Sequence, residues 1–195
     1  MFNIVNDFEK KIADFYNAPY AIATDSCTHA IELCLRFKRF NEVIIPNRTY
    51  ISVAFLPIKL NLKWSWSKNE WKNYYYLGNT NIIDAAVYWK KGGYISGSYM
   101  CLSFQFQKHL SLGRGGMILC DNYESYNSLK KMSYDGRLPN IPWREQNINL
   151  VGFHYYMTPE TAAIGIDKLS QAKITVPREW VWSDWPDLSQ MDVFQ

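Results

Sequence analysis

The sequence contains little of what marks several protein classes. Only 10 of its 195 residues are glycine and 8 are proline, which excludes collagen-like and low-complexity chains. No apolar run approaches the ~18 residues that a membrane-spanning helix needs, and no run of about five like charges marks a nucleic-acid-binding arm. Residues 1–11 include acidic side chains and lack the apolar core of a signal peptide. We therefore expect a cytoplasmic protein that binds neither membrane nor nucleic acid.

Cysteine and histidine are also scarce, and their spacing does not suit metal binding. The four cysteines form no C-x-x-C pair and lie inside apolar segments, and the three histidines show no i, i+4 spacing. The cysteines are Cys27, Cys34, Cys101 and Cys120, and the histidines are His29, His109 and His154. This pattern predicts buried, reduced thiols and no metal site.

Aromatic residues, in contrast, are abundant. They make up 16% of the chain and concentrate at residues 64–76 and 180–185. The hydrophobic share of 48% and the charged share of 20% are those of a folded globule, and the length predicts one domain over residues 1–195. Lysines among the aromatics of the first cluster also permit a surface that stacks single-stranded nucleic acid. The net charge of only +3 favours a core or dimer-interface role for both clusters instead.

Helical and strand patterns alternate along the chain. The spacing of Val5, Phe8, Ile12 and Phe15 predicts an opening helix. Further helices are predicted after Thr28, at about 122–133 and at about 158–171, and short strands at 20–24, 43–45, 64–66, 81–86, 100–104 and 117–120. The apolar strands show no polar face, which is typical of an α/β layered fold with a mostly parallel or mixed sheet. Ligands of such sheets bind outside the carboxyl ends of the strands.

Three of the predicted strand ends carry side chains that suit catalysis. The turn Ser26-Cys27-Thr28 opens a helix, where free N–H groups suit a phosphate; a plain helix cap is the simpler alternative. Asp84 follows an apolar strand and needs a partner, either a neighbouring loop or the protonated ring of a cofactor. Lys108 precedes the glycine turn Gly113–Gly116 and is either a solvated surface lysine or a desolvated Schiff-base nucleophile.

Five short motifs follow one another along the chain. They are Asp25-Ser-Cys-Thr-His-Ala30, Ile44-Ile-Pro-Asn-Arg-Thr-Tyr50, Ile83-Asp-Ala-Ala86, Ser103-Phe-x-x-x-Lys108 with Gly113-x-Gly-Gly116, and Gly152-Phe-His-Tyr-Tyr-Met157 with Ala162, Ala163 and Gly165. In this order they resemble the DegT/StrS-type sugar aminotransferases, fold-type-I enzymes that use pyridoxal 5′-phosphate. The resemblance covers about Phe8 to Leu169 and implies the three-layer large domain of that fold.

The resemblance implies a reaction and two catalytic residues. Lys108 is similar to the lysine that forms a Schiff base with the cofactor and then shuttles a proton. Asp84 is similar to the acid that keeps the pyridine nitrogen protonated. The implied reaction transfers an amino group from glutamate to a keto sugar, usually nucleotide-linked.

The resemblance also implies cofactor-binding residues and a dimer. Ser103 and the Cys27-Thr28 turn are similar to phosphate ligands, and Tyr50 and Ala86 to the residues that pack on the two faces of the ring. Residues 152–157 resemble the segment that reaches the partner subunit's active site in a homodimer. His154 stands there in place of the usual asparagine.

The chain departs from the family pattern at several positions. Val87 stands where a glutamine or histidine usually binds the ring's 3-hydroxyl, Cys27 replaces a small residue and Arg114 an acidic one. The stretch between Tyr50 and Asp84 is shortened, and the C-terminal small domain of longer members is missing. So short a version suggests a compact genome such as that of a virus, with the host cytoplasm as the location.

These departures leave two other functions open. A degenerate relative would keep the fold as a binding or assembly module without transaminase turnover. Alternatively, the cofactor would serve dehydration or racemisation of a sugar. Relatives that dehydrate replace the lysine with histidine, so Lys108 argues against dehydration, although His109 is adjacent to it.

Overall fold

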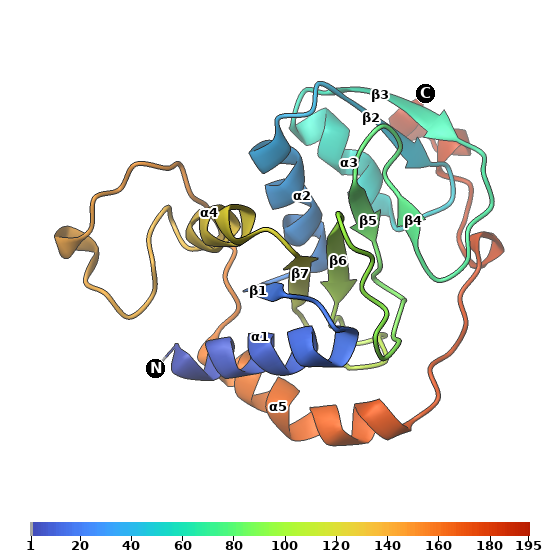
Figure 1. Cartoon of the computed structure of the whole chain (residues 1–195). Helices are drawn as coiled ribbons and strands as arrows, with labels where there is room; N and C mark the ends of the chain where they lie inside the picture. Colours follow the sequence, from blue (N-terminus) through green and yellow to red (C-terminus); the bar gives the residue numbers. More distant parts are fainter. Residues whose placement is uncertain (1) are drawn as a thin grey trace.

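The computed structural model describes residues 2–195, in which helices cover both faces of a central sheet (Figure 1). The helices are α1 (Asn3–Tyr16), α2 (Cys27–Lys38), α3 (Ile51–Lys59), α4 (Tyr123–Ser133) and α5 (Pro159–Ile174). The strands are β1 (Tyr20–Thr24), β2 (Glu42–Pro46), β3 (Lys63–Ser67), β4 (Tyr75–Tyr76), β5 (Ile82–Asp84), β6 (Tyr99–Ser103) and β7 (Gly116–Cys120). Short 3₁₀ turns are η1 (Trp143–Glu145), η2 (Trp182–Asp184), η3 (Leu188–Gln190) and η4 (Asp192–Phe194). Within residues 2–195, no helix is long and apolar enough to cross a membrane.

The prediction is a mostly parallel or a mixed sheet, and the central sheet is mixed. Its strand order is β1-β7-β6-β5-β4, in which β5 and β6 are parallel and the other neighbouring pairs are antiparallel. β2 and β3 pair in parallel as a separate two-stranded sheet. The antiparallel return from β6 to β7 follows from their connection, a loop without a crossover helix.

Both faces of the central sheet are buried. On one face Ile22, Cys101 and Ile118 pack in a core that includes side chains of α2, α3 and α4. On the other face Met100 and Leu119 pack in a second core with side chains of α1 and α5. Figure 1 shows α1 and α5 side by side on this second face. This two-sided burial explains why the strands are apolar on both faces.

The terminal helices of the predicted set form as their sequences indicate. Phe8 and Ile12 of α1 are fully buried, which accounts for the helical spacing of the apolar residues. The Thr158 side chain caps α5 by accepting from the Thr161 N–H at 3.3 Å, and Pro159 occupies the first turn. A Cβ at Gly165 would lie 2.6 Å from a ring carbon of Phe8, so glycine permits the contact of α5 with α1.

Helix α3 is absent from the predicted elements. Pro57 lies inside it, and its apolar residues are spread around the helix, so the sequence shows no clear helical period. Val53, Ala54 and Leu56 are nevertheless buried in the core that α3 shares with α2 and β2. Helix α3 is therefore stabilised by tertiary packing, which its local sequence pattern does not predict.

The two aromatic clusters of the sequence pack on one another. Phe194, beyond the second cluster, packs edge-on against both Trp64 and Trp66 of β3, at 6.1 and 5.3 Å between ring centroids. Trp71 approaches Trp185 at 6.4 Å. The C-terminal residues therefore lie against the segment from β3 to β4. Trp64, Trp66 and Trp71 of the first cluster also pack against the core, and the predicted dimer-interface role of the clusters stays a prediction.

Candidate active site

Strand direction brings the three polar strand ends to one edge of the central sheet. β1 and β6 are both antiparallel to β7, and β5 is parallel to β6, so β1, β5 and β6 end at the same edge. In the register, Thr24 and Ser103 both pair with Gly116, and Asp84 pairs with Cys101. The helix N-terminus after β1, Asp84 after β5 and the lysine turn after β6 therefore meet.

A cavity of about 340 Å³ opens at this edge. Its lining includes every predicted site residue except His154, namely Cys27, Thr28, Tyr50, Asp84, Ala86, Ser103 and Lys108. A second cavity of about 400 Å³ adjoins it and shares Ala86, Ser103 and Lys108. Lys108 thus stands at the boundary between two hollows.

Asp84 is a buried carboxylate with two hydrogen-bond donors. Its Oδ2 accepts from the Tyr75 hydroxyl at 2.5 Å and its Oδ1 from the Ala86 N–H at 2.9 Å. Burial raises the pKa of Asp84 above its ordinary value, and the bonds from Tyr75 and Ala86 and the charge of Lys108 oppose that shift. A cationic group placed against this carboxylate would compensate its loss of water.

Lys108 is a partly desolvated lysine. Burial lowers its pKa, and the nearby Asp84 opposes the shift. Its Nζ lies 5.7 Å from the ring centroid of Trp180 and 5.6 Å from that of Trp185. No carboxylate of residues 2–195 forms an ion pair with it. A lysine with a lowered pKa has more neutral amine near pH 7 than a surface lysine has.

The N-terminus of α2 forms another part of the cavity. The Ser26 hydroxyl caps the helix by accepting from the His29 N–H at 3.2 Å, so the plain-cap alternative holds for this residue. Thr28 remains at the cavity, with its hydroxyl 2.6 Å from that of Ser52. A Cβ at Gly116 would lie 2.3 Å from the carbonyl carbon of Ser26, so glycine lets β7 approach the turn. The free N–H groups of such a turn suit an anion.

The thiol of Cys27 is buried and already has a hydrogen-bond partner. The Sγ donates to the Cys101 carbonyl at 3.6 Å, and burial raises the pKa of the thiol well above its ordinary value. The predicted phosphate contact of Cys27 therefore depends on its N–H group.

Tyr50 and Val87 add an aromatic and an aliphatic side chain to the lining of the cavity. Tyr50 is 52% exposed and meets Trp185 edge to face at 6.2 Å. Its exposed ring is available to pack on a flat ligand. Val87 lines the cavity without a hydrogen-bonding group, as its sequence position implied.

His154 lies away from this cavity in the single chain. Its side chain is 70% exposed, and its Nδ1 lies 3.1 Å from Asp135 Oδ2. Its predicted role concerns the partner subunit's site, so it stays a prediction.

Several lining residues carry no role in the sequence-based prediction. The Thr49 hydroxyl bonds the Tyr75 hydroxyl, which holds Asp84, and Arg114 pairs with Asp25 at 2.8 Å. Trp185 reaches the cavity from the C-terminal tail. The aromatic clusters were the available signal for Tyr75 and Trp185, whereas nothing in the local sequence indicates that these residues meet Asp84 or Lys108.

The residues present fit pyridoxal 5′-phosphate. The buried acid suits a protonated ring nitrogen, the desolvated lysine suits an aldehyde, and the helix N-terminus beside Gly116 suits a phosphate. Within residues 2–195, no group of three or more His, Cys, Asp or Glu side chains is placed to hold a metal ion.

Known proteins share this fold. The chain matches AtS13 from Actinomadura melliaura at 19% identity and a TM-score of 0.73, over 87% of this chain and 60% of that one. It matches the sugar aminotransferase CalS13 from Micromonospora echinospora at 12% identity and a TM-score of 0.74, over 87% and 60%. It matches 3-amino-5-hydroxybenzoic acid synthase at 20% identity and a TM-score of 0.74, over 87% and 56%. The chain thus spans about 60% of the length of these relatives.

A sequence comparison assigns the family. A search of curated proteins gave no match. The profile of the DegT/DnrJ/EryC1/StrS aminotransferase family, however, matches residues 2–64 and 83–181, and so includes the α2 turn, Asp84 and Lys108. The gap in the match, residues 65–82, lies within the stretch between Tyr50 and Asp84. The chain therefore belongs to the DegT/DnrJ/EryC1/StrS aminotransferase family.

Proposed function

We propose that this chain binds pyridoxal 5′-phosphate at the sheet edge and transfers an amino group from glutamate to a keto sugar, nucleotide-linked as the family resemblance implies. One observation carries the proposal: Asp84 and Lys108 line the same cavity as the N-terminus of α2, although they come from different strands. Burial lowers the pKa of Lys108, which is the direction that a Schiff-base amine needs. Burial raises the pKa of Asp84, and a cationic ring placed against the carboxylate would oppose that shift.

Each part of the cofactor has candidate partners in the cavity. The N–H groups of the Cys27-Thr28 turn and the hydroxyls of Thr28 and Ser103 would bind the phosphate. Asp84 would pair with the ring nitrogen, and Tyr50 and Ala86 would pack on the ring.

The side chains of this chain hold and move protons. When bound, the cofactor supplies the electron sink for charge that develops on the donor's α-carbon. Asp84 keeps a proton on the ring nitrogen by opposite-charge attraction, and the Tyr75 hydroxyl at 2.5 Å fixes the carboxylate for this task. Lys108 would take the proton from the donor's α-carbon and deliver it to the cofactor, which its lowered pKa favours because the amine must be neutral to act as a base.

The proposed active form is a homodimer in the cytoplasm. Residues 137–152, between α4 and α5, extend away from the body of the chain (Figure 1). This arm precedes His154 and would bring it towards the partner subunit's site. All four cysteines are buried and free, as a reducing compartment allows.

Reductive trapping tests the proposal. Purified protein is incubated with pyridoxal 5′-phosphate, reduced with borohydride and digested with a protease. The masses of the peptides are then measured by mass spectrometry. We expect a pyridoxyl adduct on Lys108, and we expect Lys108→Ala to show no visible absorption band of the protein-bound cofactor. Identical spectra for wild type and Lys108→Ala would refute a catalytic Lys108.

A second candidate is a cofactor-binding module without transaminase turnover. It is favoured by Val87, which lines the cavity and offers the cofactor no hydrogen bond. Addition of glutamate to the loaded protein decides between the two: formation of pyridoxamine 5′-phosphate supports the transferase, and an unchanged cofactor with glutamate and other amino donors supports the module.

A further inference from the structure

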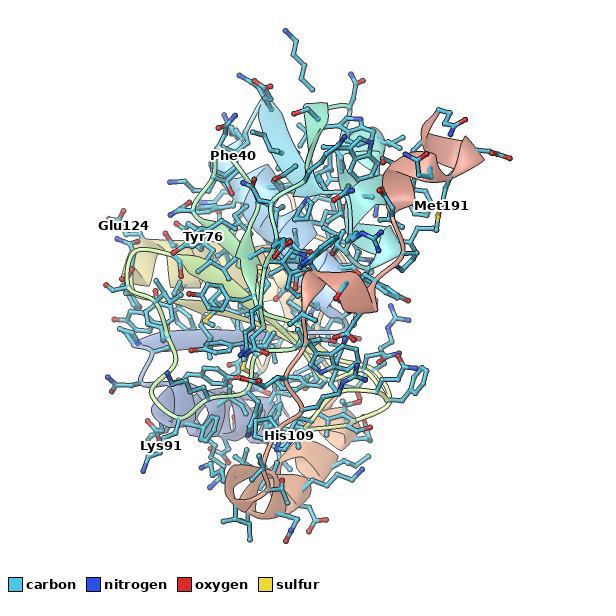
Figure 2. The ribbon with its side chains drawn as sticks, turned by 90° about the vertical axis from the view of Figure 1, so that its right-hand side faces the viewer. Phe40, Tyr76, Lys91, His109, Glu124 and Met191 are labelled. Atoms are coloured by element: carbon cyan, nitrogen blue, oxygen red, sulfur yellow. The ribbon has the colours of Figure 1, made fainter. Side chains whose placement is uncertain are left out.

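The second cavity, of about 400 Å³, lies beside the proposed cofactor site, and the C-terminal tail forms part of its wall. After α5 the chain runs past His109 (Figure 2), whose Nε2 lies 3.1 Å from the Thr175 hydroxyl. Arg178 and Trp180 of the tail then line the cavity, and Lys108 lines it from the turn after β6. The tail therefore brings a cationic and an aromatic side chain to the cavity that Lys108 borders.

The lysine and arginine side chains of this lining have no acidic counterpart there. Lys108 contributes an ammonium group and Arg178 a guanidinium group, and the lining includes no aspartate and no glutamate. The first cavity differs, because Asp84 lines it and does not line the second. A hollow lined by charges of one sign attracts a ligand of the opposite sign. The second cavity therefore favours an anion.

Two contacts hold the guanidinium of Arg178. Its Cζ lies 3.9 Å from the centroid of the Trp180 ring, and its Nη2 donates to Asp184 Oδ1 at 2.9 Å. Asp184 does not line the cavity, and its Oδ2 accepts from the Val181 N–H at 2.9 Å. The Arg178 side chain is still 61% exposed, and a guanidinium has five N–H donors. Arg178 is thus oriented by Asp184 and keeps further donors for a ligand.

The Trp180 ring connects Arg178 to Lys108. Its backbone is fixed by Asn73, whose Oδ1 accepts from the Trp180 N–H at 3.0 Å and whose N–H donates to the Trp180 carbonyl at 2.8 Å. Lys108 Nζ lies 5.7 Å from the centroid of the ring on which Arg178 stacks. The two basic groups therefore border one indole ring, and their separation is at most the sum of the two centroid distances. An extended amino acid with a side-chain carboxylate can reach from one group to the other.

We propose that the second cavity is the subsite of the amino donor and that Arg178 binds a carboxylate of this donor. The inference rests on the proposed function and deepens it, because it gives a place to the glutamate which that function requires. With its amino group next to Lys108, glutamate would direct a carboxylate to Arg178, and the Trp180 ring would border its carbon chain. The subsite then selects amino acids over amines that lack a carboxylate.

Binding of glutarate tests the inference, because this dicarboxylate has the carbon chain of glutamate and no amino group to react. Calorimetric titration of the protein loaded with pyridoxal 5′-phosphate compares wild type, Arg178→Gln, Arg178→Lys and Lys173→Gln. Lys173 is exposed on α5, lines neither cavity and is the control for the loss of one positive charge nearby.

We expect Arg178→Gln to bind glutarate about 10- to 100-fold more weakly, the loss typical of a hydrogen bond between charged groups. Arg178→Lys should fall between this variant and wild type, since lysine keeps the charge without the planar fork of donors. Lys173→Gln should bind glutarate as wild type does. All four proteins should bind the cofactor equally, because Arg178 does not line the first cavity.

Conversion of the cofactor by glutamate gives a second readout. We expect Arg178→Gln to raise the KM for glutamate by about the factor that it raises the Kd for glutarate, with a smaller change in kcat, because Arg178 contacts the carboxylate and not the reacting atoms. The midpoint of thermal unfolding should change little, since the Arg178–Asp184 ion pair lies at the surface.

The outcomes separate this inference from the proposed function. Wild-type affinity of Arg178→Gln for glutarate, or no glutarate binding by loaded wild type, would overturn the inference and leave the proposed function intact. An equal loss in Lys173→Gln would overturn it too, because the effect would then be one of general charge. Weaker cofactor binding by Arg178→Gln would place Arg178 at the cofactor instead. Failure of wild type to bind pyridoxal 5′-phosphate would refute the proposed function itself, and with it this inference.

Discussion

Asp84 shows how a residue can favour a ligand at the expense of the free protein. Its carboxylate is buried, and burial raises its pKa above the ordinary 3.8. In the folded, cofactor-free protein it therefore binds a proton more readily than in the unfolded chain. The stability of the free protein should accordingly fall as the pH rises from about 4 through the folded-state pKa, because the unfolded chain binds fewer protons in that window.

Replacement of Asp84 by asparagine tests whether the buried carboxylate lowers the stability of the cofactor-free protein and raises its affinity for the cofactor. Asparagine keeps the acceptor for the Ala86 N–H and removes the buried charge. We expect the cofactor-free Asp84→Asn protein to be more stable above the folded-state pKa, by about 1.4 kcal/mol for each pH unit that separates the pKa of Asp84 in the folded and unfolded states. We expect cofactor affinity to fall about 10- to 100-fold, as loss of a charged hydrogen bond implies. Denaturant titration across pH and calorimetry measure the two effects. Equal stability of both proteins at every pH would contradict the assigned burial cost.

Lys108 should react more readily than the surface lysines near neutral pH. Burial lowers its pKa, so a larger fraction is neutral at pH 7.5. We expect reductive methylation in the absence of cofactor to label Lys108 ahead of Lys91, which is exposed at the edge of the molecule (Figure 2). At pH 10 the difference should shrink, because the other amines also lose their protons. Mass spectrometry of the peptides measures the ratio, and a ratio that does not depend on pH would count against a lowered pKa.

At the scale of elements, one buried ion pair joins α1 to α4. Lys130 Nζ lies 2.5 and 2.6 Å from the two carboxylate oxygens of Glu9, and both residues are buried. Glu9 also accepts from the Ala23 N–H of β1 at 2.7 Å. Each charge therefore depends on the other for compensation.

Removal of one partner should be costly, and removal of both charges should restore stability. We expect Lys130→Met to lower the free energy of unfolding by about 3–5 kcal/mol, because Glu9 is left buried and charged. Adding Glu9→Gln should recover much of the loss, since the amide oxygen can still accept from Ala23. Equilibrium unfolding in urea tests both variants. An additive loss in the double variant would show that packing, rather than the charge, dominates.

The contact between β7 and α2 depends on the absence of a side chain at Gly116. A Cβ there would lie 2.3 Å from the Ser26 carbonyl carbon and 2.5 Å from the Cys27 nitrogen. We expect Gly116→Ala to cost about 1–3 kcal/mol in stability and to weaken phosphate binding, since the turn must move. Gly92→Ala is the control, because its added Cβ meets nothing within 4 Å and only its φ of +65° causes strain. Equal cofactor affinity of Gly116→Ala and wild type would contradict a phosphate site at this turn.

At the scale of the whole molecule, the arm between α4 and α5 is the candidate dimer contact. Ile141, Trp143, Ile148 and Val151 are 43%, 53%, 44% and 77% exposed, respectively. Apolar side chains gathered on one protruding segment are typical of an interaction surface. The same arm leads to His154, whose proposed position is beside the partner subunit's cofactor.

Charges placed on the arm should separate the subunits. We expect wild type to sediment as a species of twice the 22.9 kDa mass of the chain. We expect the double variant Trp143→Asp, Val151→Asp to sediment as a monomer with an unchanged far-ultraviolet circular dichroism spectrum. Sedimentation velocity at several concentrations makes the measurement. A wild-type monomer at all concentrations would contradict the proposed homodimer.

The sequence by itself determined most elements and much of the site. The helices at both ends, the strands around Ile22, Ile83 and Met100, and the three polar strand ends could be predicted, because apolar spacing and helix caps are local properties of the chain. The order of the motifs was enough to identify Lys108 and Asp84 as candidates in one family's chemistry.

Only the tertiary structure decided what these residues meet. Helix α3 lacks a clear period and forms because its side chains are buried against α2 and β2. The Thr49–Tyr75–Asp84 hydrogen bonds and the wall that Trp185 adds to the cavity join segments far apart in the sequence. No local pattern encodes such contacts, because they depend on how the chain returns through the sheet. Burial, which also depends on that return, sets the protonation of Asp84 and Lys108 and therefore what the cavity can bind.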